Sequence, residues 1–342
     1  MLVLCLLPAR VHGDGIWVHP DSRFADLDQA LVDDDFSKAQ KLLSDLRSQS
    51  RKTNDLAFQA EITLRGKEIA KMARDYEKVT QILKSQQLDD LDPKSAVEVG
   101  KYYCGVKADW SKGLPLLMKG ADSQLAAAAA ADNLNPKEPE LQIELADKWL
   151  EWVQKKNLDE RATYQLRARH WLMLAGSATR NEKTHLSIQT RLKQIPLYPE
   201  RIVVWNTHND MYCDRGAEEF VVSLLSDGKV VWQQTVPIAW KPNNPSFALI
   251  RPPRTRADQI QIRITKHHGR GGGLGEIQVF ARNVNLAELA QPVVDGIFES
   301  KDRFGPAMLI DGDVSGASGF WICDNGKSGS ASIHFQQFPV IK

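Results

Sequence analysis

The chain has 342 residues, a formal net charge of +1, and 25% charged residues. A chain of this length is expected to form two domains, and its composition is that of a globular protein. Because Lys and Arg are scattered and nearly balanced by acidic residues, neither nucleic acid nor an anionic membrane surface is expected as a partner.

The N-terminus suggests export. Residues 1–7 read MLVLCLL and are followed by Pro8, Ala9 and Arg10, which is typical of the apolar part and exit of a secretory signal peptide. No Lys or Arg precedes the apolar run, so residues 1–13 are interpreted as a signal-peptide remnant or as a segment of the mature protein. We therefore expect a secreted or cell-envelope protein, periplasmic or extracellular. No later stretch is long and apolar enough for a membrane span.

Residues 21–195 show helical periodicity with few breakers, which predicts an all-α domain. The acidic run at 33–35 predicts a turn and an N-cap between the first two helices. Asp92 and Pro93 predict another helix start, because Asp caps free N–H groups and Pro fits the first helical position. Further helices are expected at 57–83, 110–119, 122–131, 136–155, 158–175 and 182–195.

Residues 99–120 read VGKYYCGVKADWSKGLPLLMKG. Their small residues, aromatic pair and D-W-x-K-G-L-P-L-L stretch resemble tetratricopeptide-type helical repeats, in which Gly or Ala lets helices approach closely. A partial echo at 145–150 and 164–174 is not strictly periodic, so the domain is described as repeat-like. The region also resembles helical segments beside sugar-binding-type sandwiches in large exported bacterial proteins. Its Trp and Tyr side chains fall at helical spacings and are interpreted as core.

The pattern changes to a period of two after residue 198, which predicts strands. Asp227 and Gly228 predict a hairpin turn, because this pair readily adopts positive φ. Short, closely spaced strands with turn signals indicate a β-sandwich or jelly roll. The expected strands are 201–205, 220–225, 230–234, 246–250, 259–264 and 276–280.

The strand region carries a more specific resemblance. The stretches V-V-W-N-T-H-N-D-M-Y-C-D-R-G at 203–216 and G-G-G-L-G-E-I-Q-V-F at 271–280 look like the latter half of a discoidin, or coagulation factor 5/8 type C, module. This module belongs to the galactose-binding-like superfamily. Residues 307–313, 319–322 and 331–335 resemble the opening half of the same module, which here comes after the back half.

Two explanations compete for this reversed order. Residues 199–342 form one circularly permuted sandwich, with its back half at 199–283 and its front half at 284–342, or the chain holds a back half and an unfinished second front half. Open half-sandwiches leave unpaired strand edges, so permutation is favoured. The chain is thus expected to be an α+β multidomain protein, with a helical repeat-like domain at 21–195 and a galactose-binding-like sandwich at 199–342.

The resemblance also implies calcium as a structural cofactor. Many relatives hold this ion near an Asp-Gly-Asp loop and the glutamate of the last strand, and calcium prefers several hard oxygen ligands. The matching positions are Asp311, Asp313, Ser315 and Glu276. The alternative interpretation is a solvated acidic turn in which Asp and Gly only make the bend.

Polar and aromatic residues gather near the predicted loops of the sandwich. The candidate ligand-binding residues are His208, Asp210, Arg215, His267, His268 and Trp240. Their spacing fits no standard zinc pattern, so the alternative is that they fix loops, for example through an Asp214–Arg215 ion pair. The glycine run at 269–273 lacks the Lys-Ser/Thr of a phosphate-binding loop and is expected to be a turn.

The four cysteines, Cys5, Cys104, Cys213 and Cys323, form no C-x-x-C pair, which argues against a zinc or thioredoxin-like site. In a permuted and exported sandwich, Cys213 and Cys323 would share one domain. A disulfide between them then depends on their distance, which the sequence leaves open.

No standard catalytic motif is present, so we expect a non-catalytic binding protein. Its sandwich is expected to recognise a carbohydrate or cell-surface polymer. The alternatives are a helical protein–protein interaction scaffold with a structural sandwich, and an accessory part of a larger enzyme. An exposed Trp or Tyr flanked by His or Arg at a loop end would favour carbohydrate, whereas an apolar groove on the helical half would favour peptide.

Overall fold

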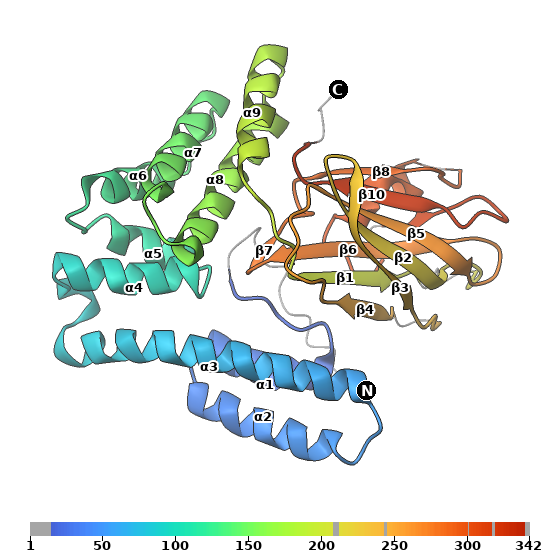
Figure 1. Cartoon of the computed structure of the whole chain (residues 1–342), viewed down its shortest axis with the longest axis horizontal. Coiled ribbons are helices and arrows are strands. Elements are labelled where there is room, and N and C mark those ends of the chain that lie inside the picture. Colours follow the sequence, from blue (N-terminus) through green and yellow to red (C-terminus); the bar gives the residue numbers. More distant parts are fainter. Residues whose placement is uncertain (1–14, 208–211, 243–244, 300, 317–318, 339–342) are drawn as a thin grey trace. The chain divides into compact units, whose positions relative to one another are not determined.

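The computed structural model describes residues 15–207, 212–242, 245–299, 301–316 and 319–338 (Figure 1). Residues 1–13, interpreted above as a signal-peptide remnant, and Cys5 lie outside these ranges. The chain divides into two compact units. The first contains Met1–Pro136 and Lys148–Tyr164, and the second contains Lys137–Asp147 and Gln165–Lys342. A helical region followed by antiparallel sheets confirms the two-part α+β layout.

The first unit is helical. Its elements are η1 (Ser22–Phe24), α1 (Ala25–Val32), α2 (Phe36–Ser50), α3 (Leu56–Ser85), η2 (Leu88–Asp90), α4 (Pro93–Gly105), α5 (Trp110–Leu117), α6 (Ser123–Asn133) and the adjoining parts of α7 (Pro139–Val153) and α8 (Leu158–Ala178). Aspartates cap many of these helices, because a short carboxylate accepts hydrogen bonds from the first free N–H groups. Asp35 caps α2 and Asp92 caps α4 as predicted, with Pro93 in the first turn.

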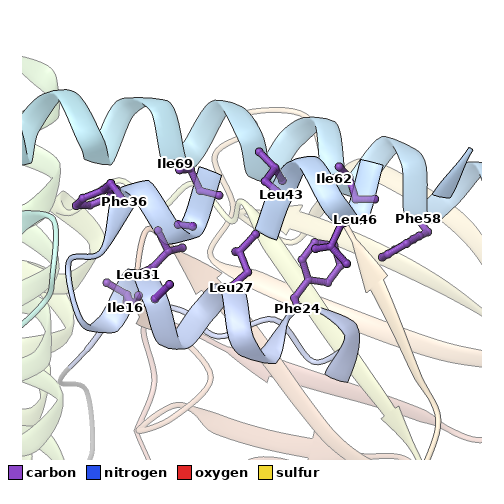
Figure 2. Packing of buried hydrophobic residues seen from close by; sticks show 12 residues of the cluster. Ile16, Phe24, Leu27, Leu31, Phe36, Leu43, Leu46, Phe58, Ile62 and Ile69 are labelled. Carbon is purple, nitrogen blue, oxygen red and sulfur yellow. The ribbon is translucent and has the colours of Figure 1, made fainter. Parts of the chain in front are cut away.

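Apolar stripes of α1, α2 and α3 form the first core (Figure 2). Phe24, Leu27 and Leu31 point from one side toward Leu43 and Ile62, and all five are buried. A second group surrounds Trp149, whose ring stacks on Tyr164 at a centroid distance of 5.0 Å. These aromatic side chains are core residues, as their helical spacing predicted.

The glycines of the repeat-like stretch allow α4 and α5 to approach closely. A Cβ atom on Gly113 would lie 2.2 Å from Cys104 Sγ and 2.9 Å from the carbonyl oxygen of Gly100. Any larger residue at this position would push the two helices apart. The predicted role of small residues at 99–120 is therefore present in this helix pair.

The second unit combines helical segments with two antiparallel sheets. Most of α8 and all of α9 (Glu182–Gln194) belong to it, as does the start of α7. The expected domains 21–195 and 199–342 therefore do not coincide with the two units. The strands are β1 (Arg201–Asn206), β2 (Ala217–Ser226), β3 (Lys229–Pro237), β4 (Phe247–Ile250), β5 (Gln259–His267), β6 (Gly273–Ala281), β7 (Val284–Asn285), β8 (Gln291–Val294), β9 (Trp321–Ile322) and β10 (Ser330–His334). Short helices α10 (Lys301–Phe304) and η3 (Pro306–Leu309) precede β9.

The sheets mix strands from both halves of the sandwich sequence. One sheet has the order β4-β1-β6-β7, with β9 also paired to β6, and the other has the order β3-β2-β5-β10-β8 (Figure 1). β10 pairs with β5, placing Ala331 opposite Ile262, and β9 pairs with β6, placing Trp321 opposite Leu274. Segments 199–283 and 284–342 thus share both sheets, as the single-sandwich explanation requires.

Alternation along these strands places one set of side chains in a common core. Phe220, Val222 and Leu224 of β2 are buried, as are Ile260 and Ile262 of β5. Asp227 and Gly228 join β2 to β3 with φ of 50° and 74°, which confirms the predicted hairpin turn. No helix in the described part of the chain has the length and apolarity needed to cross a membrane.

Candidate functional site

A buried carboxylate stands in the middle of the second unit. Glu276 lies on β6 opposite Trp205 of β1, and its exposed fraction is 0%. Neither carboxylate oxygen has a hydrogen-bond partner within the described residues. The backbone N–H of Gly312 lies near this carboxylate and lowers its pKa. An isolated buried carboxylate is costly, so this group either holds a proton or meets a cation.

Burial is the main cause of the high pKa of Glu276, which is raised to about 9. The negative charges of Asp311 and Asp313 raise this pKa further, as does Glu288. The Asp-Gly-Asp loop and the last-strand glutamate that the sequence analysis grouped therefore act on each other electrostatically in the folded chain.

The loop itself is a tight acidic turn. The carboxylate of Asp311 accepts a hydrogen bond from the N–H of Asp313 at 2.9 Å. The carboxylate of Asp313 in turn accepts from the N–H of Ser315 at 2.9 Å and from its hydroxyl at 2.5 Å. Gly312 has φ of 82°, which suits glycine at this bend. These hydrogen bonds hold the loop in an Asp-Gly bend.

The donor set also fits calcium in its chemistry. Each candidate ligand is a carboxylate or hydroxyl oxygen, and Glu276 offers two oxygens that no donor satisfies. Across the described residues, no group of three or more His, Cys, Asp and Glu side chains converges with metal-binding geometry. Glu276, Asp311, Asp313 and Ser315 are the residues that would hold a calcium ion here, and the ion would supply positive charge to this acidic group.

A second site lies where the loop before β2 meets the segment after β3 and the end of β5. The indole ring of Trp240 stacks on the imidazole of His268, with 3.8 Å between centroids and 8° between planes. Trp240 Nε1 donates to the carbonyl oxygen of Arg215 at 3.0 Å, and His268 Nε2 donates to that of Cys213 at 3.2 Å. Both rings are partly exposed. Their orientation is therefore fixed before any ligand arrives. We define as the aromatic loop cluster the stacked rings of Trp240 and His268 together with Tyr212, which directly precedes the segment 213–215 that accepts both hydrogen bonds.

Tyr212 is the member of this cluster that the sequence analysis missed. It precedes Cys213 in the same segment and is 70% exposed. Its signal in the sequence is an aromatic residue inside the polar stretch 206–216, between His208, Asp210 and Arg215. His208 and Asp210 lie outside the described residues, so their predicted roles stay predictions.

Arg215 serves as a structural anchor. It is 4% exposed, and its Nε donates to the carbonyl oxygen of Cys323 at 3.2 Å, while Nη2 donates to Asn325 at 2.6 Å. Nη1 forms the ion pair with Asp214 that was the alternative interpretation of this residue. The guanidinium also lies 4.0 Å from the ring centre of Phe298. These contacts tie the loop of the cluster to the 323–325 segment. His267 is partly buried, and its Nδ1 has no partner within the described residues.

The glycine run next to His268 brings backbones together. A Cβ atom on Gly272 would lie 2.0 Å from the carbonyl oxygen of Ser328, and one on Gly269 would lie 2.4 Å from that of Asp214. Glycine is required at these close approaches, and the one between Gly272 and Ser328 joins the two halves of the sandwich sequence. This packing agrees with the expectation of a turn at 269–273.

Cys213 and Cys323 form no disulfide in this structure. Cys323 is buried, and burial raises the pKa of its thiol to about 12. A thiol with so high a pKa is unreactive at neutral pH.

Comparison with known proteins gives no relative for this chain: no family model, curated protein or solved structure matches it. The function is therefore argued from the sites themselves.

Proposed function

We propose that this chain is a non-catalytic exported or cell-envelope binding protein whose β-unit recognises a carbohydrate or surface polymer. The aromatic loop cluster is the observation that carries the proposal. Trp240 and His268 form a preset ring pair, and Tyr212 is exposed in the segment bonded to both. Aromatic faces cover the apolar faces of sugar rings, while nearby polar groups can bond to hydroxyls.

The acidic loop has a separate role in this proposal. Calcium bound by Glu276, Asp311 and Asp313, with Ser315 beside them, would supply positive charge that satisfies the buried carboxylate and orders the loop. The ion is structural here and takes no part in a reaction.

The proposal includes a galactose-binding-like jelly roll with circularly permuted halves. It is supported by the strand pairing, because β9 and β10 of the front half complete the sheets begun by β6 and β5 of the back half. It also includes a tetratricopeptide-like helical region, supported by the close glycine contact between α4 and α5.

A glycan array probed with the full chain tests the binding proposal. We expect binding to at least one saccharide class, and loss of most of that binding in the Tyr212→Ala and Trp240→Ala variants. Tyr212→Ala is the cleaner variant, because a side chain that is 70% exposed contributes little to folding. Val293→Ala is the matched control, because Val293 is an exposed apolar residue on β8, away from the cluster in sequence. A blank array, or binding unchanged in both cluster variants, would contradict the proposal.

A peptide-binding role of the helical unit is the second candidate. It is favoured by an open groove of about 480 Å³ bordered by α4, α6 and the end of α7. The groove is lined by Lys94, Lys101 and Lys156, by Asp92, Glu98 and Asp122, and by apolar residues that include Leu125 and Trp152, so its lining is mixed. Its chemistry suits an extended polar peptide less specifically than the aromatic loop cluster suits a sugar. This is why carbohydrate recognition is preferred.

A further inference from the structure

The outer edge of β3 has no neighbouring strand in the part of the chain that the structure describes. β3 is the last strand of its sheet and pairs with β2 alone (Figure 1). Among its residues only Val236 is buried, whereas Val230 and Val231 are 52% and 44% exposed. An edge strand presents a row of N–H and C=O groups that can pair with a strand from another chain.

Edge strands are usually protected by charges, proline or a bulge. In β3 these features occur only toward the ends. Lys229 begins the strand, Pro237 ends it, and the pairing register with β2 skips Val231. Between them, residues 232–236 read Trp-Gln-Gln-Thr-Val, which carries no charge and favours a strand. The middle of this edge is therefore open to pairing.

The same five residues are complementary to themselves in the antiparallel direction. With a two-fold axis through Gln234, Trp232 faces Val236 of a second copy, and Gln233 faces Thr235. The first is an aromatic–β-branched pair and the second is polar, and no like charges oppose each other. This register also places Val231 opposite Pro237. Val231 is skipped in the pairing with β2 and Pro237 has no N–H to donate, so both lie outside the proposed ladder of residues 232–236. Each favourable pair occurs twice across the axis.

We propose that β3 is a self-association edge, at which two copies of this chain join antiparallel through residues 232–236. The sheet β3-β2-β5-β10-β8 then continues into the second copy. Because the ladder is short and exposed, association is reversible and rises with concentration. Pairing also places two binding units in one particle, although self-association does not depend on carbohydrate recognition.

Sedimentation velocity of the full chain, from micromolar to millimolar concentration, tests this proposal. We expect a monomer–dimer equilibrium in the unaltered chain. Gln234→Lys sets two like charges against each other at the axis, which weakens association by about fivefold or more. Gln233→Lys is the matched control, because the new lysine faces Thr235 and shifts the dimer constant much less. Both glutamines are exposed, so both variants should keep the melting temperature of the unaltered chain.

A charge-pair experiment completes the test. Mixing Gln234→Lys with Gln234→Glu places opposite charges across the axis, so association returns as a mixed dimer while each variant alone stays weak. Three results would overturn the proposal: a monomer at every concentration, equal weakening by the two lysine variants, or no association in the mixture.

Discussion

Glu276 shows how a single residue couples the fold to a ligand. Its side chain lies on the face of β6 opposite to Ile277 and Val279, yet it is fully buried, although Glu is among the residues least often buried without a partner. The carboxylates of Asp311 and Asp313 then act on it from a loop more than thirty residues away in sequence. The family resemblance placed these three residues in one group. The burial of Glu276 and its repulsion by the two aspartates follow from the packing of the folded chain.

The high pKa of Glu276 predicts a pH-dependent stability. Without divalent cations, the carboxyl group of Glu276 keeps its proton in the folded chain. In the unfolded chain this group releases the proton above its ordinary pKa of 4.5. The stability that protonated Glu276 gives to the folded chain is fully present below pH 4.5 and is lost as the pH rises toward about 9. The unfolding free energy should fall in this window by at most about 1.4 kcal/mol per pH unit, and Glu276→Gln should remove that slope. Urea denaturation in chelator at several pH values measures the difference.

Calcium supplies the other half of this prediction. Calcium that binds the ionised Glu276 should raise the melting temperature more at pH 8 than at pH 5, because with a pKa of about 9 the ionised carboxylate is far less populated at pH 5. Glu276→Gln should lose most of the shift, and magnesium serves as the control ion. A melting temperature that ignores both calcium and chelator at every pH would contradict the calcium site.

At the scale of elements, the glycine run at 269–273 allows close backbone contacts at the start of β6. The sequence predicts a turn at 269–273. In the structure these glycines also lie so close to another backbone segment that a Cβ atom would not fit. The partner segment, residues 322–328, comes from the other half of the sandwich sequence. The local sequence does not reveal that glycine is required here, because the atom that would clash with a Cβ belongs to a residue far away in the chain.

Gly272→Ala should therefore destabilise the chain strongly. The new Cβ would lie 2.0 Å from the carbonyl oxygen of Ser328, which is backbone and cannot rotate away. Overpacking of this kind typically costs about 1–3 kcal/mol. Gly296→Ala is the control, since a Cβ there meets nothing within 4 Å. Chemical denaturation of both variants checks the contrast, and equal stability would show that the close approach is wrong.

At the scale of the whole molecule, the change of period near residue 198 does not mark the end of a structural unit. Arg169 of α8 is buried, and its guanidinium donates to the carbonyl oxygens of Leu286 and Phe335, both at 2.9 Å. Burial lowers the pKa of Arg169 to about 10, so it stays charged at neutral pH. The ring of Phe338 also packs so closely on Gly176 that a Cβ there would lie 2.4 Å from it. These contacts make α8 part of the β-unit.

A fragment of residues 137–342 should thus be more stable than one of residues 199–342. The shorter fragment loses the charged donor for two carbonyl groups, which costs about 3 kcal/mol or more. It also lacks Gly176 and the face of α8 around it, so the ring of Phe338 becomes exposed. We expect a lower urea midpoint and more aggregation for residues 199–342. Equal midpoints would place the boundary at the period change instead.

The sequence by itself determined the helical and strand periods, the aspartate caps such as Asp35 and Asp92, and the Asp227–Gly228 hairpin. These features depend on nearby residues, so local chemistry is sufficient to predict them. Only the tertiary structure decided which distant segments pair, that Arg215 is an anchor, that Tyr212 is exposed, and that α8 joins the sheets. Such outcomes depend on burial and on backbone contacts between residues far apart in the chain. A local sequence pattern does not identify those distant contacts.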